Sequence, residues 1–315
     1  MFSVSINPTY FCNFNCDFCY LSKEQLRDRT KATHGQIMRR LEQIDVPISH
    51  VDLYGGEIGL LQDEYLNVLI DDIKKEYNPT ISIITNLSAV RDVFLRDDIE
   101  LSVSYDFDAR EKQHIVLTNM MMLTRPFSVL TLASEKVINT DVDFMISTFN
   151  TLSNLKCVEI KPFSSTTHRS QRVTDLQFED FIKEWIDNPQ EKKWQFLNQD
   201  KIEDCLDGKY NAFSDDHVYI TPSGNFGVLD FDLLGNEHFT ELTSFEQYKK
   251  WAQREKTAGV SDICKNCKYF GGCLTEHYKY VEDLKNGCNG YKGLLDWYDE
   301  GLESETDGVS RDVER

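Results

Sequence analysis

Three cysteines stand close together near the start of the chain. Cys12, Cys16 and Cys19 lie within eight residues and directly follow a β-rich run at residues 2–6. Ligands of α/β proteins bind beyond the carboxyl ends of strands, and three thiolates can bind three irons of a cubane cluster while leaving the fourth iron open. The alternatives are a zinc site that lacks its fourth ligand or a chance grouping, and the position after a strand favours the iron–sulfur cluster.

A second group of cysteines lies near the other end of the chain, at Cys264, Cys267, Cys273 and Cys288. Four thiolates complete either a tetrahedral zinc site or a fully ligated iron–sulfur cluster, and neither leaves a position open for substrate. The spacing alone slightly favours zinc. Of the two remaining cysteines, Cys157 is expected to be a small core residue, whereas Cys205, with acidic neighbours, is expected to be a free, more exposed thiol.

The first half of the chain must position the three-cysteine group. The expected strands are residues 2–6, 50–54, 81–85, 100–105, 127–132 and 158–162. Helical candidates between them include residues 35–44, 64–76, 109–123 and 142–152. Strands that alternate with helices, each strand but the last being followed by one, imply parallel βα units. Periodicity alone allows either an open doubly wound sheet or a curved partial barrel.

The second half is less regular. The polar segment 164–174 predicts a boundary, and a helix is expected over residues 176–186. Residues 217–220 and 226–231 flank a turn and predict a hairpin. A last helix is expected near residues 291–298, followed by a solvated acidic tail at 300–315.

Composition limits the possible partners and location. The 315 residues carry 34 Lys and Arg against 53 Asp and Glu, a formal net charge of −19. Extensive binding to duplex nucleic acid or to anionic lipid is therefore not expected. The sequence has neither an 18-residue apolar run nor a signal peptide, and its nine cysteines are an odd number, so we expect a cytoplasmic protein without a membrane partner.

The spacing Cys-x3-Cys-x2-Cys, with Phe18 just before the third cysteine, resembles the signature of the radical S-adenosylmethionine (SAM) superfamily. The resemblance implies a partial (β/α)6 barrel, a [4Fe-4S] cluster and SAM bound to its open iron. It also implies an electron donor such as flavodoxin or ferredoxin. Reductive cleavage of SAM then gives a 5′-deoxyadenosyl radical that abstracts a hydrogen atom from the substrate.

Three further segments match where the resemblance requires SAM contacts. Gly55, Gly56 and Glu57 follow the second expected strand; the glycines allow close approach of the backbone, and the carboxylate is expected to accept the SAM ammonium group. Asn86 at the end of the third strand and Ser104 at the end of the fourth are weaker matches. For Ser104, capping of a turn is an equal alternative.

For two charged residues near these strand ends we expect simpler roles. Asp106 is predicted to be the N-cap of the helix that follows the fourth strand. Lys161, on the sixth strand, is predicted to be a solvated edge lysine rather than one that points into the mouth of the barrel.

The four later cysteines resemble the C-terminal SPASM extension, or its shorter twitch form, which holds auxiliary clusters. In this resemblance Cys264, Cys267, Cys273 and Cys288 bind one auxiliary [4Fe-4S] cluster. The ligands of another auxiliary cluster are mostly lost, because Leu229 and His277 stand where cysteines are found. One auxiliary cluster is therefore expected, and His277 is expected to be a surface or substrate-facing residue rather than a ligand.

The same resemblance suggests a catalytic residue and a division of the chain. Asp230 corresponds to an aspartate that removes a substrate proton in some relatives, although a solvated strand-end carboxylate is the simpler interpretation. The expected domains are a radical SAM partial barrel at 1–165, a bridging helical segment at 166–210, a SPASM/twitch-like auxiliary-cluster domain at 211–299 and the acidic tail at 300–315.

The sequence thus predicts a radical SAM enzyme, an oxidoreductase or an isomerase. The leading hypothesis for its substrate is a peptide or an amino-acid-like group that undergoes oxidation, crosslinking, epimerisation or rearrangement. The alternative is a nucleotide, hypermodified base, sugar or other small-molecule substrate, because many peptide maturases carry a leader-binding module for which Cys12 leaves no room upstream. A non-enzymatic alternative is a zinc-bearing interaction protein, which would leave the first cysteine group unexplained.

Overall fold

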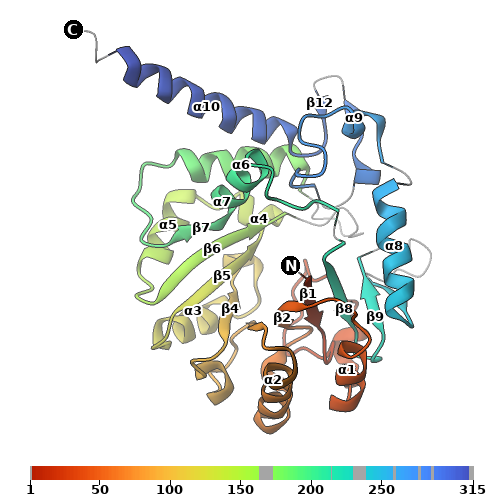
Figure 1. The fold of residues 1–315 in the computed structure, drawn as a ribbon. Coiled ribbons are helices and arrows are strands. Elements are labelled where there is room, and N and C mark those ends of the chain that lie inside the picture. The colour runs from red at the N-terminus through yellow and green to blue at the C-terminus, as the bar shows by residue number, and fades with distance from the viewer. Residues whose placement is uncertain are drawn as a thin grey trace.

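The computed structural model describes residues 2–162, 173–213, 215–229, 239–257, 260–275, 278–284 and 287–311 (Figure 1). The first half contains the strands β1 (Phe2–Ile6), β2 (Ile48–Leu53), β3 (Thr80–Thr85), β4 (Glu100–Ser104), β5 (Phe127–Leu132) and β6 (Leu155–Lys161). Its α-helices are α1 (His34–Leu41), α2 (Asp63–Tyr77), α3 (Gln113–Met122), α4 (Glu135–Ile138) and α5 (Val142–Asn150). Short 3-10 helices are η1 (Gln25–Arg27), η2 (Ile58–Leu60), η3 (Asp92–Leu95) and η4 (Phe107–Ala109).

The second half adds helices around the sheet and three strands to its first edge. Its α-helices are α6 (Asp175–Asp187), α7 (Leu197–Leu206), α8 (Phe245–Thr257), α9 (Asp262–Lys265) and α10 (Lys292–Arg311), and η5 (Tyr278–Tyr280) is a 3-10 helix. Its strands are β7 (Gln195–Phe196), β8 (His217–Ile220), β9 (Phe226–Val228), β10 (Thr240–Leu242), β11 (Asp283–Leu284) and β12 (Gly287–Cys288).

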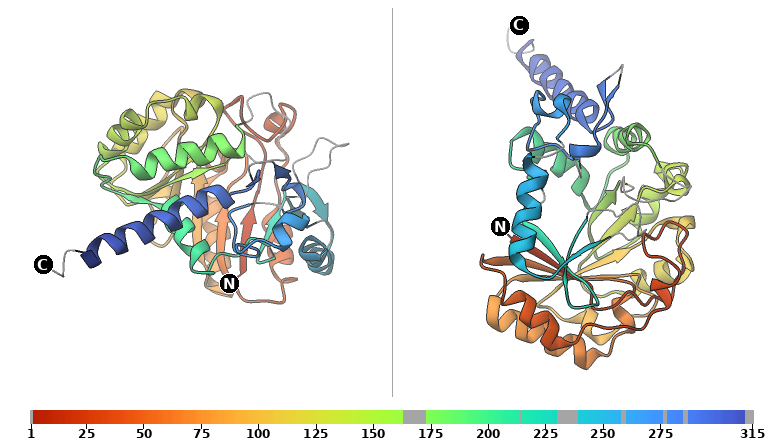
Figure 2. Two further views of the ribbon diagram at one scale, coloured as in Figure 1. Left: turned by 90° about the horizontal axis from the view of Figure 1, so that it is seen from above. Right: turned by 90° about the vertical axis from the view of Figure 1, so that its right-hand side faces the viewer.

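Strand order decides between the two sheet architectures. The large sheet runs β10-β9-β8-β1-β2-β3-β4-β5-β6-β7, and β1 to β6 are parallel neighbours in chain order. A doubly wound sheet would reverse its order at a switch point. The order therefore confirms the predicted α/β fold of the partial-barrel type, in which α1, α2 and α3 cover the outer face (Figures 1 and 2).

The apolar strand residues form the core, as expected for parallel strands buried on both faces. Val4, Ile6, Val51, Leu53 and Ile83 are fully buried. Capping helps to start the first helix, because the Thr33 side chain and the Gln36 side chain form a reciprocal capping box at α1. This packing fixes the strands, so their carboxyl ends are held at one end of the barrel.

The predicted hairpin extends the sheet of the first half. Strands β8 and β9 are antiparallel, and β8 pairs in parallel with β1, with Val4 opposite Val218. The strand predicted to reach residue 231 ends at Val228, and residues 230–238 lie outside the described part of the chain. The sheet therefore continues across both predicted domain boundaries, at 165 and at 210.

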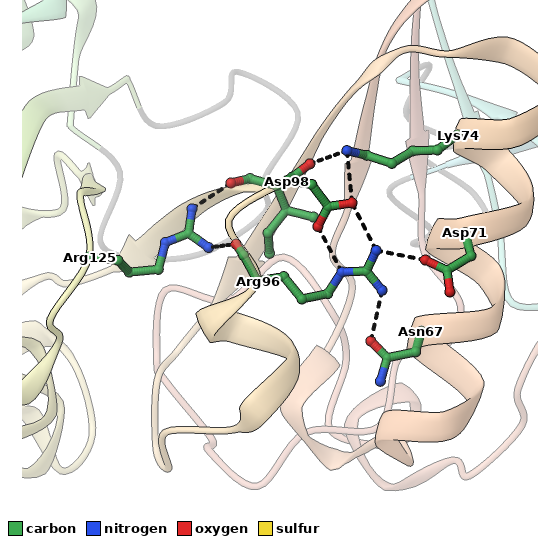
Figure 3. Close-up of polar contacts among 7 residues, drawn as sticks. Asn67, Asp71, Lys74, Arg96, Asp98 and Arg125 are labelled. Atoms are coloured by element: carbon green, nitrogen blue, oxygen red, sulfur yellow. Dashed lines mark hydrogen bonds and ion pairs between the residues drawn. The ribbon is translucent and has the colours of Figure 1, made fainter.

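One predicted connection differs from a regular βα unit. Between β3 and β4 the chain forms only the 3-10 helix η3. Figure 3 shows polar contacts that hold this link, made by Asn67, Asp71, Lys74, Arg96, Asp98 and Arg125. The Arg96 guanidinium lies 2.6 Å from an Asp71 oxygen on α2 and bonds to Asp98 at 2.9 Å. Arg125 donates to carbonyl groups of the same link, so side-chain bonds replace the missing helix.

The last helix is longer than expected. Helix α10 continues to Arg311, through most of the residues predicted to form an acidic tail. Leu294 and Leu295 near its start are fully buried, and the helix then projects away from the rest of the protein (Figure 2). No helix in the described residues is long and apolar enough to cross a membrane.

Candidate active site

The carboxyl ends of the parallel strands surround one cavity of about 440 Å³, here called the cluster cavity. The expected site residues that line it are Cys12, Cys16, Phe18, Cys19, Gly55, Gly56, Asn86 and Ser104. Residues that are up to 92 positions apart in the chain therefore meet, because the ends of β1, β2, β3 and β4 meet.

The thiols of this cavity are partly or fully buried. Burial raises the pKa of Cys12 to about 12 and also raises the pKa of Cys16. A metal overcomes such a cost because it deprotonates a coordinating thiol outright. No three Cys, His, Asp or Glu side chains in the described residues are arranged around a single-ion site. The donor set fits a cubane cluster, in which each cysteine binds its own iron.

Gly55 and Gly56 lie against the backbone that leads into the cysteine loop. A Cβ atom at Gly56 would be 2.2 Å from the carbonyl oxygen of Tyr10 and 2.4 Å from that of Phe11. Gly55 has a φ of +154°, and its Cβ would be 2.3 Å from the carbonyl oxygen of Thr9. Only glycine permits this approach. The two glycines therefore set the position of the cysteine loop as well as lining the cavity.

Glu57 lies beside the cavity and ties two strand ends together. Its carboxylate accepts hydrogen bonds from Gly59 N at 2.7 Å, from Thr85 Oγ1 at 2.6 Å and from Asn86 N at 2.6 Å. The residue is only 2% exposed, and burial raises the pKa of Glu57 against the effect of these bonds. The side chain holds the turn after β2 against the end of β3, while the adjacent glycine backbone faces the cavity.

Asn86 contacts the cysteine loop directly. Its Nδ2 lies 3.8 Å from Cys12 Sγ and donates to Asn13 Oδ1 at 3.0 Å. The backbone N–H of Phe14 also points at Cys12 Sγ, at 3.4 Å. These donors are hydrogen-bond partners of the Cys12 sulfur, and where a sulfur binds a metal such partners orient it and adjust the metal. Sequence reasoning placed Asn86 near SAM but missed this contact.

Asp106 occupies the N-cap position of η4, as predicted, but its side chain makes no capping bond there. Its carboxylate pairs with the Arg110 guanidinium, at 2.5 Å from Nη2 and 2.7 Å from Nε. It also accepts a hydrogen bond from the backbone N–H of Leu132 at 2.5 Å. The Arg110 guanidinium lies 5.5 Å from the centre of the Phe18 ring. It is also a nearby cation that lowers the pKa of Cys16 against burial. Sequence reasoning missed Arg110, for which the i, i+4 spacing from Asp106 was the only signal.

The four later cysteines line a separate cavity of about 280 Å³, with Tyr269, Phe270 and Tyr278 among its walls. Burial and the neighbouring thiols raise the pKa of Cys264 to about 11, and burial raises that of Cys273 to the same value. Four thiols around one apolar cavity can complete a closed site, either a zinc site or a fully ligated cluster. No described residue of this group lines the cluster cavity.

The structure also tests the expectations for Cys157, Cys205 and Lys161. Cys157 is a buried residue whose sulfur lies 2.9 Å from Ser128 Oγ, as predicted for a small core residue. Cys205 is buried at 4% exposure, so the prediction of a more exposed thiol was wrong. It shares the inner face of α7 with Ile202, while its acidic neighbours face outward. Lys161 is solvated, as predicted, with a side chain that is 47% exposed, but it also lines the cluster cavity and pairs with Glu159.

Asp230 and His277 lie outside the described residues, so the roles predicted for them remain predictions.

Comparison with known proteins agrees with this geometry. Residues 6–109 match the model of the Radical SAM superfamily, and this range includes all three cysteines of the cluster cavity. No curated protein sequence matches the chain.

Among the solved structures that are similar over most of the chain are those of two different proteins. One is native anSMEcpe with bound AdoMet and Cp18Cys peptide, at a TM-score of 0.65 and 14% identity, over 98% of this chain and 99% of that chain. The other is Streptococcus suis SuiB bound to S-adenosylmethionine, at a TM-score of 0.60 and 15% identity, over 86% of this chain and 72% of that chain. At these identities the similarity establishes a shared fold.

Proposed function

We propose that the protein is a radical SAM enzyme that abstracts a hydrogen atom from a peptide or an amino-acid-like substrate. The observation that carries the proposal is the cluster cavity, where three thiols meet a glycine backbone at the carboxyl ends of parallel strands. Its volume of about 440 Å³ suits a cofactor-sized ligand. When bound, the cluster supplies an electron to SAM, which is cleaved to methionine and a 5′-deoxyadenosyl radical.

The residues of the cavity have separate roles in this proposal. Cys12, Cys16 and Cys19 hold three irons of a [4Fe-4S] cluster. Gly55 and Gly56 bring backbone polar groups to SAM, and Glu57 fixes that turn with three accepted hydrogen bonds. Phe18, Asn86 and Ser104 complete the walls around the cofactors.

Arg110 is a positive group beside Cys16, and it is held in place by Asp106. Its contact with the Phe18 ring ties this ion pair to the cysteine loop.

The second cysteine group is proposed to hold one auxiliary [4Fe-4S] cluster through Cys264, Cys267, Cys273 and Cys288. These thiols converge on one apolar cavity, which supports a closed, fully ligated site. Asp230 is proposed to accept a proton from the substrate, and replacing it with Asn tests this by asking whether product is lost while SAM cleavage continues. Flavodoxin or ferredoxin is the proposed electron donor.

A peptide substrate is supported by the structural neighbours. One anSMEcpe structure contains a bound Cp18Cys peptide, and one SuiB structure is bound to the precursor peptide SuiA. For this chain we propose a substrate of the same class.

Iron and sulfide analysis tests the chemistry. Anaerobically prepared protein should contain about eight irons and eight acid-labile sulfides for two [4Fe-4S] clusters. Replacing Cys12, Cys16 and Cys19 together with Ala should halve both values and abolish formation of 5′-deoxyadenosine from SAM. Cys157→Ala is the matched control and should change neither. Zinc at unit stoichiometry without sulfide would contradict the proposal.

Hydrogen abstraction needs a separate measurement. Reduced enzyme and SAM are incubated with peptide, nucleic-acid and small-molecule fractions from deuterium-grown cells, and the 5′-deoxyadenosine is analysed by mass spectrometry. We expect deuterium to appear with the peptide fraction. Its appearance only with the nucleic-acid fraction would contradict the proposed substrate class.

A further inference from the structure

A second cavity of about 400 Å³, here called the lysine cavity, lies next to the cluster cavity. The two cavities share Lys161, His217 and Tyr219 as lining residues. Radical abstraction requires the reacting atoms to be held close together. A substrate in the lysine cavity would thus lie directly beside the proposed cofactors.

Two lysines in this cavity share one carboxylate. Lys161 Nζ lies 2.6 Å from Glu159 Oε1, and Lys201 Nζ also contacts this oxygen. Glu159 is buried, yet the two ammonium groups hold its pKa down at about 2 despite the burial. Among the described lining residues, two cations and one anion sum to a net charge of +1.

The lysines remain open to a ligand. The exposed fractions of the Lys161 and Lys201 side chains are 47% and 32%, and both side chains border the cavity. Burial lowers the pKa of Lys201, so a further negative charge in the cavity would stabilise its ammonium form. An ammonium group has three donors, so each lysine can bond to Glu159 and also to a ligand.

The two cavities also share a histidine, one of whose ring nitrogens is buried. His217 lines both, and its buried Nε2 has no hydrogen-bond partner among the described residues. An unpaired buried nitrogen is costly, and a ligand that bonds to it removes the cost. By contrast, the Asn198 amide is already paired within the protein, because it bonds to the backbone N–H and the carbonyl group of Ile160, each at 2.7 Å.

We propose that the lysine cavity binds a free carboxylate of the substrate between Lys161 and Lys201, so that the enzyme selects peptides or amino-acid-like molecules bearing such a group. This inference rests on the proposed function for its reference to a substrate. One carboxylate brings the net charge of the described lining residues to zero. A phosphate dianion would leave −1 on the same described residues, so a carboxylate is the better match to them.

Binding of small probes to the holoenzyme tests the proposal without any turnover. Saturation-transfer NMR measures the dissociation constants of N-acetylglycine, its neutral isostere N-acetylglycinamide, and methyl phosphate. We expect N-acetylglycine to bind at least about tenfold more tightly than the amide, because charge-assisted hydrogen bonds are the stronger ones. It should also bind more tightly than methyl phosphate.

Variants locate the binding. Lys201→Met should weaken N-acetylglycine binding at least about fivefold, since it removes one cation, and Lys201→Arg should restore most of the affinity. Lys75→Met, which changes an exposed lysine on α2, is the matched control and should have no effect. Glu159→Gln raises the net charge and should shift the preference toward methyl phosphate.

Several results would overturn the inference. These are equal binding of the acid and its amide, tighter binding of methyl phosphate by the unaltered protein, no binding of any probe, or equal affinity in Lys201→Met and Lys75→Met. Failure of SAM cleavage with intact carboxylate binding would instead contradict only the proposed function, so the two can be told apart.

Discussion

Arg110 and Asp106 form a buried ion pair beside the cysteine loop. Two guanidinium nitrogens of Arg110 lie 2.5 and 2.7 Å from Asp106 Oδ2, and Asp106 is only 1% exposed. The same guanidinium lies against the Phe18 ring. This pair therefore links the end of β4 to the segment that carries Cys16.

Breaking the Asp106–Arg110 pair should be strongly destabilising. Arg110→Met leaves the Asp106 carboxylate buried without its cation, which typically costs about 3–5 kcal/mol. Urea unfolding measures the loss. Combining Arg110→Met with Asp106→Asn should recover part of it, because no unpaired charge remains. Lys209→Met removes an exposed pair with Asp207 and should have a much smaller effect, because solvent screens exposed ion pairs. Similar losses of unfolding free energy in Arg110→Met and Lys209→Met would contradict this account.

Gly56→Ala should displace the cysteine loop. The added methyl group would lie 2.2–2.4 Å from two backbone oxygens, which cannot move independently of the loop. We expect a lower unfolding temperature and loss of most iron after reconstitution. Gly35→Ala is the control, because a Cβ there has no neighbour within 4 Å and α1 gains a better helix former. Normal iron content in Gly56→Ala would show that the loop tolerates the shift.

Asn86→Ala should weaken cluster retention. It removes a donor 3.8 Å from Cys12 Sγ, and losing such a partner typically costs about 10–100-fold in metal affinity. Competition with an iron chelator measures the effect. Ser88→Ala serves as the control, since Ser88 bonds to Asn13 and not to the sulfur. Identical chelation rates in both variants would place Asn86 outside the cluster environment.

Glu179 on α6 should make stability depend on pH. The residue is 2% exposed, its Oε1 has no hydrogen-bond partner in the described part of the chain, and burial raises its pKa to about 7. This value exceeds the 4.5 expected in the unfolded chain, so the folded state binds more protons between these values. The contribution of protonated Glu179 to the free energy of unfolding is therefore complete below about pH 4.5 and is lost as pH rises through 7.

Glu179→Gln should remove this dependence. Relative to the variant, the unaltered protein should lose about 2–3 kcal/mol of unfolding free energy between pH 4.5 and pH 8. Chemical denaturation across that range provides the measurement. Glu184→Gln, on an exposed position of the same helix, should leave the profile unchanged. Parallel profiles for the unaltered protein and Glu179→Gln would mean that Glu179 remains ionised in the fold.

Much of the barrel was predictable because its strands are continuous apolar runs. The limits of β1 and β5 match the predicted ones, and the others differ by at most three residues at either end. The 3-10 link between β3 and β4 was not predictable, since it depends on Arg96 and Arg125 reaching across to it. The same holds for Cys205, whose acidic neighbours suggested exposure although α7 turns the thiol inward.

The sequence by itself determined which residues could hold iron and which strand ends they follow, because cysteine spacing and apolar runs are local properties. Only the tertiary structure decided what surrounds them. The contact of Arg110 with the Phe18 ring, the bonds from Thr85 and Asn86 to Glu57, and the meeting of Lys201 with Lys161 on Glu159 all depend on how the strands close into a barrel. Such contacts form only when elements distant in the chain are packed together, so no local pattern encodes them.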